Sequence, residues 1–144
     1  MSYERFMVSQ KGILIRNGKC LIVELTNWPG YWDLPGGRVD EDEECEAAFR
    51  REIREETGLS DFEIIQTVDH DLWYTKHRHL PMCGIASLIR CDKGDIRLSV
   101  EHRDYKWIGE DELHNYLFFW KNARRMIRKG FECFRNIKES KQSL

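Results

Sequence analysis

The stretch from Gly36 to Leu59 constrains this chain more than any other part of its sequence, because acidic residues are unusually dense there. Between residues 40 and 56 it holds nine acids against three arginines, so nine minus three leaves six uncompensated negative charges. We therefore expect this stretch to bind something cationic. The acids are Asp40, Glu41, Asp42, Glu43, Glu44, Glu46, Glu52, Glu55 and Glu56.

Most of this stretch is predicted to be one helix. It should begin near residues 40–43, where acids favour the positive end of the helix dipole and can cap it. It should end at Gly58, since glycine readily takes the left-handed conformation that closes helices. Good helix formers fill the interior, and no breaker interrupts them.

The phase of this helix places carboxylates on its apolar side. At about 100° per residue, with Cys45 set to zero, Glu52 falls at about 340° and Glu56 at about 20°. Glu55 falls at about 280°, at the edge of the apolar stripe. The stripe itself is formed by Ala48, Phe49 and Ile53, and it must face the core.

Burying two ionised carboxylates side by side costs several kcal/mol per ion, roughly, unless they are paired or bind a metal. They could share protons or pair with Arg51, or they could ligate a divalent cation. Oxygen ligands favour Mg²⁺ or Mn²⁺ over Zn²⁺, and Mg²⁺ is commonly completed by substrate phosphates. The other acids, Glu41, Glu44 and Glu46 among them, are expected to be solvated surface.

The spacing of residues 37–59 resembles the Nudix box at every specified position, and such a match is far more specific than a lone glycine motif. Residues 32–37 before it, and 101–108 and 111–113 after it, are also similar to family sequence. One mild departure is Asp42, where the family often has glycine. The matching residues are Gly37, Glu43, Arg51, Glu52, Ile53, Glu55, Glu56, Gly58 and Leu59.

This resemblance implies an α/β protein of the α+β type with the Nudix fold, a mixed β-sheet sandwiched between helices. It implies a Mg²⁺ or Mn²⁺ site and a role for each matching polar residue. Arg51 would orient Glu52, and Glu43 would help hold the box together. The implied metal ligands are Glu52, Glu55 and Glu56, with the carbonyl of Gly37 and Glu101 as further candidates.

The resemblance also implies hydrolysis of a phosphoanhydride (pyrophosphate) bond in a nucleoside diphosphate-linked substrate. A nucleoside triphosphate is expected, because the chain lacks room for the added dimerisation domain common in nucleotide-sugar members. Nucleotide sugars and dinucleoside polyphosphates stay open as substrates, and so does a non-catalytic nucleotide-binding sensor. Glu52 is the first candidate for the general base, with Glu55 or Glu101 as alternatives.

Four residues outside the box are candidates for substrate binding. Trp32 could form a stacking wall for a planar ligand or pack in the core. Tyr74 resembles a tyrosine marker of the dinucleoside polyphosphate group, and an ordinary core or surface tyrosine is the alternative. Lys76 and Arg78 could bind distal phosphates or simply belong to a polar hairpin loop.

The rest of the chain predicts a mixed α/β layout in a single domain, residues 1–144. Apolar segments at 6–16 and 20–25 flank Asn17-Gly18 and predict a hairpin. Strands are expected at 62–69, 82–90 and 105–108, and a helical region from residue 110 to 117. The apolar residues of a long C-terminal amphipathic helix are Trp120, Ala123, Ile127, Phe131, Phe134 and Ile137.

Composition excludes several classes of function. A net charge of −2 argues against stable nucleic-acid or membrane binding. The basic tail, residues 121–141, has eight bases minus two acids, or +6, which suits an anionic partner or a solvated helix face. The five cysteines form no C-x-x-C pair and are expected to be reduced core thiols. With no leader or membrane-span pattern, the expected location is cytoplasmic, and the oligomeric state stays open.

Overall fold

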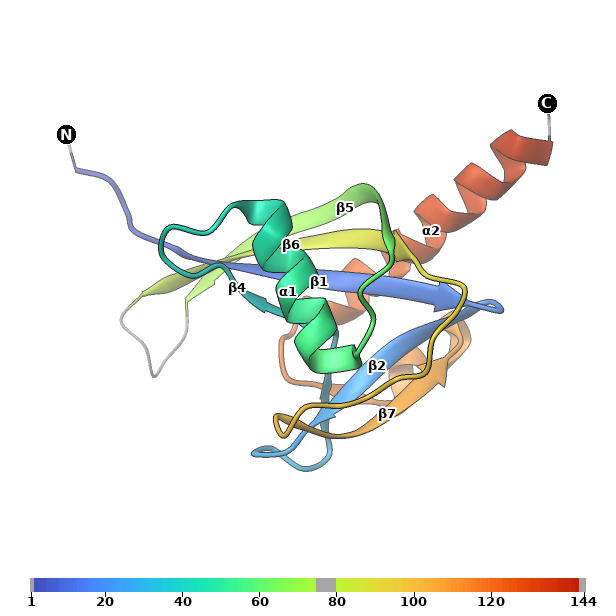
Figure 1. Ribbon diagram of the computed structural model, residues 1–144, viewed down its shortest axis with the longest axis horizontal. Helices are drawn as coiled ribbons and strands as arrows, with labels where there is room; N and C mark the ends of the chain where they lie inside the picture. Colours follow the sequence, from blue (N-terminus) through green and yellow to red (C-terminus); the bar gives the residue numbers. More distant parts are fainter. Residues whose placement is uncertain (1, 75–79, 143–144) are drawn as a thin grey trace.

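The computed structural model describes residues 2–74 and 80–142, which form a mixed β-sheet with a helix on each face (Figure 1). This arrangement confirms the predicted mixed layout. The elements in chain order are β1 (Met7–Arg16), β2 (Lys19–Leu25), β3 (Tyr31–Asp33), β4 (Gly36–Arg38), α1 (Cys45–Thr57), β5 (Glu63–Tyr74), β6 (Pro81–Arg90), β7 (His102–Ile108), the 3₁₀ helix η1 (Glu110–Asn115), β8 (Leu117–Phe118) and α2 (Ala123–Gln142).

The hairpin of β1 and β2 organises the sheet. Asn17 and Gly18 have φ values of 51° and 75°, which the Asn-Gly pair was expected to supply, and Arg16 then pairs with Lys19. Strand order is β5-β6-β1-β2-β3-β8, with β4 also paired to β1 and β7 to β2. The β1–β6 and β3–β8 pairs are parallel, and the other pairs are antiparallel.

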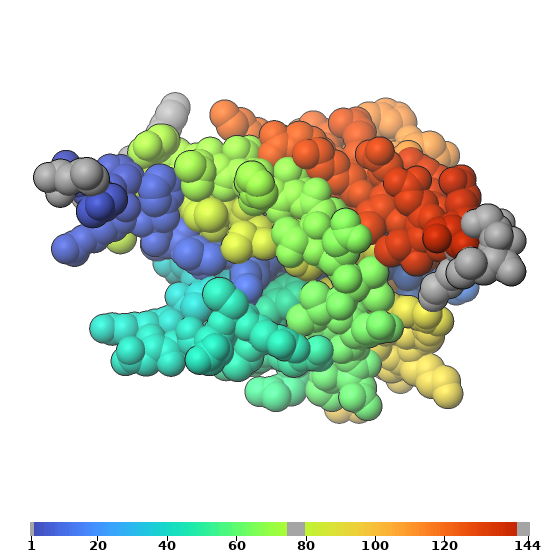
Figure 2. All heavy atoms as spheres, turned by 90° about the horizontal axis from the view of Figure 1, so that it is seen from above, coloured from blue at the N-terminus to red at the C-terminus, as the bar shows by residue number. Residues whose placement is uncertain are grey.

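Two apolar cores lie on opposite faces of β1. On one face, Leu14 joins residues of α1, including Phe49 and Ile53. On the other face, Ile13 joins residues of α2, including Ile127. Figure 2 shows the same layers from above, with α2 (red) on one side of the strands and the α1 segment (teal to green) on the other.

Glycines at the crossing points allow the close packing of these layers. A Cβ on Gly12 would overlap the end of the Ile53 side chain, and a Cβ on Gly130 would overlap Ile13. Both helices therefore pack closely against β1, α1 through Ile53 at Gly12 and α2 through Gly130 at Ile13.

The predicted start of α1 was wrong. The helix begins at Cys45 rather than at residues 40–43, because Asp42 has a φ of 64°, which no α-helix accommodates. Its predicted end is confirmed, since Gly58 is left-handed at φ 79° and its N–H donates to the Arg54 carbonyl. Cys45 is exposed, so it is not the core thiol expected; Cys20 and Cys91 are buried.

Other boundaries also shifted. The strand expected at 62–69 continues to Tyr74, because β5 pairs with β6 along its whole length. Trp120 precedes α2, which begins at Ala123. The helical region expected from residue 110 is the η1 turn, and it gives way to β8 by Leu117. Among the described residues, no helix is long and apolar enough to cross a membrane.

Candidate active site

Helix α1 carries the carboxylates at graded depths. Ile53 is fully buried, and this sets which side of α1 faces the core. The side of the helix next to Ile53, which contacts β4, therefore also faces inward. Glu56 is only 4% exposed there. The Glu52 side chain is 17% exposed and that of Glu55 is 52% exposed. The order of depth agrees with the helical phase expected from the sequence.

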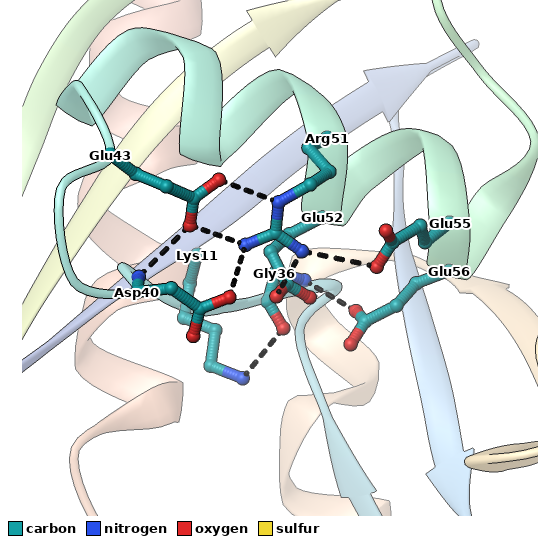
Figure 3. A network of polar contacts seen from close by, with 8 residues as sticks. All are labelled: Lys11, Gly36, Asp40, Glu43, Arg51, Glu52, Glu55 and Glu56. Atoms are coloured by element: carbon teal, nitrogen blue, oxygen red, sulfur yellow. Dashed lines mark hydrogen bonds and ion pairs between the residues drawn. The ribbon is translucent and has the colours of Figure 1, made fainter.

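The Arg51 guanidinium ties the acids together (Figure 3). Its Nε and Nη2 donate to the two carboxylate oxygens of Glu43, each at 2.7 Å, and Nη1 donates to Glu52 Oε1 at 3.0 Å. Weaker bonds reach Glu55 at 3.2 Å and Asp40 at 3.3 Å. Hydrogen bonding by Arg51, and by the Asp40 N–H, lowers the pKa of Glu43 to about 2. Arg51 therefore fixes the direction of the Glu52 carboxylate, and Glu43 fixes Arg51.

A second set of contacts holds the turn of residues 33–37 beneath the helix. The Gly36 N–H donates to Glu56 Oε2 at 2.7 Å. From β1, the Lys11 ammonium donates to Asp33 Oδ2 at 2.9 Å and lies 3.5 and 3.4 Å from the carbonyls of Leu34 and Gly36. These three acceptors match the three N–H donors of a lysine. Lys11 therefore positions the turn.

Both glycines of that turn are required by their neighbours. Gly36 has a φ of 134°, and a Cβ there would overlap the Gln10 carbonyl. A Cβ on Gly37 would overlap the Glu52 carboxylate. The backbone of Gly37 thus lies directly against a carboxylate, where its carbonyl could serve as a further ligand.

Burial dominates the electrostatics of this site. It raises the pKa of Glu56 to about 8, although the Lys11 ammonium acts against the shift. Burial also raises the pKa of Glu52, with Arg51 opposing. For Lys11, burial alone would lower the pKa, but Asp33 and Glu56 outweigh it and raise the value. A divalent cation would relieve the desolvation of both carboxylates, and their oxygens suit Mg²⁺ or Mn²⁺.

The side chains that the structure describes do not form a complete set of metal ligands. Within residues 2–74 and 80–142, no three His, Cys, Asp or Glu side chains converge in a geometry that could hold a metal. Glu52 and Glu55 instead share Arg51. Ligation by Glu55 would require its exposed side chain to turn away from Arg51.

A cleft of about 1540 Å³ connects the carboxylates to an aromatic wall. Gly37, Glu52, Glu56 and Glu101 line it together, so four of the five expected metal ligands share one cavity. Further along, the cleft is bordered by Trp28, Trp73, Tyr74, Phe119 and Trp120.

The remaining predicted residues lie in different places. Trp32 is 7% exposed and packs edge-on against Tyr116 in the core, so it does not line the cleft. Tyr74 lines the cleft and is 72% exposed. Lys76 and Arg78 fall outside the described residues.

The sequence did not single out three residues at this site. Lys11 holds the turn of residues 33–37, and Trp28 and Phe119 line the cleft. A charged residue inside the apolar β1 segment was a usable signal for Lys11. Its partner Asp33 is 22 residues away, however, and only the pairing of β1 with β4 brings the 33–37 turn beneath Lys11.

Comparison with known proteins identifies the family to which this fold and site correspond. The family model described as the NUDIX domain matches residues 9–130. A curated relative, nucleoside triphosphatase NudI of Salmonella paratyphi B, is 35% identical over 72% of this chain and 82% of its own length.

Solved structures agree on the fold. The MutT protein of Methanosarcina mazei superimposes with a TM-score of 0.77 at 20% identity, covering 94% of this chain and 99% of that one. An Ap4A hydrolase of C. elegans gives a TM-score of 0.76 at 21% identity, covering 90% and 98%. At these identities the likeness is one of fold, and it confirms the expected fold class.

Proposed function

The chain belongs to the Nudix family and is a Nudix hydrolase, and we propose that it uses Mg²⁺ or Mn²⁺ to cleave a phosphoanhydride bond of a nucleoside triphosphate. The observation that carries this proposal is a pair of carboxylates on the wall of an open cleft: Glu56 is buried, and the Glu52 side chain is only 17% exposed. Desolvation raises the pKa of both, and groups perturbed in this way cluster at functional sites. We also propose that residues 1–144 act as one domain.

The proposed metal ligands are Glu52, Glu55, Glu56, the Gly37 carbonyl and Glu101. A bound Mg²⁺ or Mn²⁺ would neutralise phosphate oxygens and lower the pKa of a water molecule. Glu56 supports this role best, because its Oε2 is fixed by the Gly36 N–H while Oε1 accepts none of the hydrogen bonds found among the described residues.

Glu52 is the proposed general base. It lines the cleft, its direction is set by Arg51, and burial raises its pKa above the ordinary value of a glutamate, which makes the carboxylate a better proton acceptor. Glu101 also lines the cleft and is the alternative. Glu55 lies outside the cleft lining and is the weaker third candidate. Arg51 acts by positioning Glu52.

The nucleoside triphosphate assignment is supported by the nucleoside triphosphatase relative at 35% identity. Dinucleoside polyphosphates are a second candidate substrate, favoured by the exposed Tyr74 on the cleft wall. Both substrates carry the phosphate chain that the carboxylate site requires, and they differ in what occupies the far part of the cleft.

A substrate panel tests this function. Purified protein with Mg²⁺ should be offered the four nucleoside triphosphates, a dinucleoside tetraphosphate and a nucleotide sugar, and the products separated by ion-exchange chromatography. We expect the kcat/KM of the protein to be highest for a nucleoside triphosphate. A preference for the nucleotide sugar would overturn the substrate assignment, and nucleotide binding without hydrolysis would identify a sensor.

A further inference from the structure

We propose that Trp28 and Phe119 form the platform on which the heterocyclic base of the substrate stacks. This inference rests on the proposed nucleotide hydrolysis and deepens it, because it assigns the base-binding part of the cleft to residues outside the Nudix box. Together with Tyr31 and Trp120, these two residues form what we call the aromatic ledge.

The rings of the ledge are in continuous contact. The Trp28 and Phe119 centroids are 5.5 Å apart, Tyr31 meets Phe119 edge-on at 6.3 Å, and Trp120 meets it edge-on at 4.8 Å. Trp28 is nevertheless 52% exposed and Tyr31 41% exposed. Large exposed rings gathered in one place mark binding surfaces, since they leave apolar area in contact with water.

Both ring-bearing segments are anchored to the same short strand. The Tyr31 N–H donates to the Trp28 carbonyl at 3.0 Å, and the Gly30 N–H donates to Glu24 Oε2 at 2.8 Å. The Phe119 N–H donates to the Trp32 carbonyl at 2.9 Å. The backbones of Trp28 and Phe119 are therefore hydrogen-bonded to the two ends of the Tyr31–Trp32 segment, which brings their rings together.

That strand also leads directly into the metal-binding turn. Asp33 ends β3 and is held by Lys11, and Gly36 donates to Glu56. The ledge and the carboxylates are thus joined by a few residues of hydrogen-bonded backbone. This connection fixes the separation between a stacked base and the phosphates that reach Glu52 and Glu56.

The chemistry of the cleft favours a nucleobase over a protein or lipid partner. Trp28, Phe119 and Trp120 line the same hollow as Glu52 and Glu56, so a ligand on the ledge is within the cavity that receives the phosphates. The basic side chains Arg38 and Lys121 also line it. A planar base carried on a phosphate chain matches both features, and aromatic rings bind any base because every base has a π face.

Kinetics of ledge variants test the proposal. Trp28→Ala should raise KM for nucleoside triphosphates about 5- to 150-fold, as expected for a lost base stack, with kcat changed less than about 2-fold. Trp28→Phe, which keeps a ring, should restore most of the affinity. Phe119→Leu, which keeps apolar volume without a ring, should also raise KM.

Two controls separate stacking from general damage. Tyr105→Ala removes a ring that is 38% exposed on β7 but lies outside the cleft, and it should leave KM unchanged. Inorganic tripolyphosphate has phosphates and no base, so any hydrolysis of it should be unaffected by Trp28→Ala. A similar KM increase for both substrates, or none for nucleoside triphosphates, would overturn the ledge as a base site.

Binding measured without turnover distinguishes failure of this inference from failure of the proposed function. Isothermal titration with Mg²⁺ and a nucleoside triphosphate analogue that carries methylene groups at both the α,β and the β,γ bridges should show the same 5- to 150-fold loss of affinity in Trp28→Ala. If the wild type binds the analogue through Trp28 but hydrolyses no nucleotide, the ledge stands and the proposed hydrolysis falls. If it hydrolyses nucleotides and Trp28→Ala binds the analogue normally, the ledge falls alone.

Discussion

Glu56→Gln is predicted to stabilise the metal-free protein at alkaline pH while abolishing the proposed metal-dependent hydrolysis. Burial raises the pKa of Glu56 from 4.5 to about 8. Between these values the folded protein holds a proton that the unfolded chain has released, so the free energy of unfolding falls as the pH rises. The slope is about 1.4 kcal/mol per pH unit, and the whole interval amounts to at most about 5 kcal/mol.

Glutamine keeps the shape of the side chain and an oxygen that can accept the Gly36 N–H, but it does not titrate. The unfolding free energy of Glu56→Gln should therefore lack this slope. At pH 8 in EDTA, the variant should be more stable than the wild type by several kcal/mol, roughly.

The assay is urea unfolding at one-unit steps from pH 5 to pH 9, followed by circular dichroism. Glu46→Gln is the matched control, because Glu46 lies on the same helix with its side chain 70% exposed, and it should leave the pH dependence unchanged. If wild type and Glu56→Gln show parallel stability curves, burial does not raise the pKa of Glu56 in the folded protein.

The same group links metal affinity to pH. A divalent cation ligated by Glu56, as proposed, would compete with the proton on this carboxylate, so Mn²⁺ affinity of the wild type should rise with pH until about pH 8 and then level off. In Glu56→Gln, Mn²⁺ affinity should be much weaker and nearly independent of pH. Full hydrolytic activity in this variant would refute the metal assignment.

Three further substitutions have specific expected outcomes. Gly37→Ala places a Cβ against the Glu52 carboxylate and should weaken Mn²⁺ binding at least about tenfold by titration calorimetry; unchanged affinity would contradict the predicted contact. Arg51→Lys loses the two-bond contact with Glu43 and should lower kcat with KM little changed, at a cost of about 1–3 kcal/mol in urea unfolding; an unaltered kcat would mean that Glu52 needs no orientation. Ile53→Ala empties a fully buried position and should cost about 2–5 kcal/mol of stability, whereas a cost near zero would place α1 away from the core.

Features that depend on local backbone demands could be predicted from the sequence. The Asn17-Gly18 turn and the Gly58 helix end both require positive φ, and glycine or asparagine at those positions indicates it directly. The inward direction of Glu52 and Glu56 follows from helical periodicity alone. The helix start did not follow, because an aspartate, Asp42, takes the left-handed conformation where composition suggested a helical acid.

Features that depend on strand pairing could not be predicted in the same way. Trp28 and Trp32 lie only four positions apart in the sequence, and composition does not distinguish their roles. The pairing of β3 with β2 and β8 turns Trp32 into the core and leaves Trp28 on the cleft. The Lys11–Asp33 contact likewise depends on how distant segments are brought together.

The most direct test of the central claim is hydrolysis of a nucleoside triphosphate in ¹⁸O-labelled water, with products resolved by ³¹P NMR, with Mg²⁺ and again with EDTA. We expect Mg²⁺-dependent cleavage of one phosphoanhydride bond with label in one product, and no cleavage in EDTA or in Glu56→Gln. Turnover that persists in EDTA, or that survives Glu56→Gln, would contradict it.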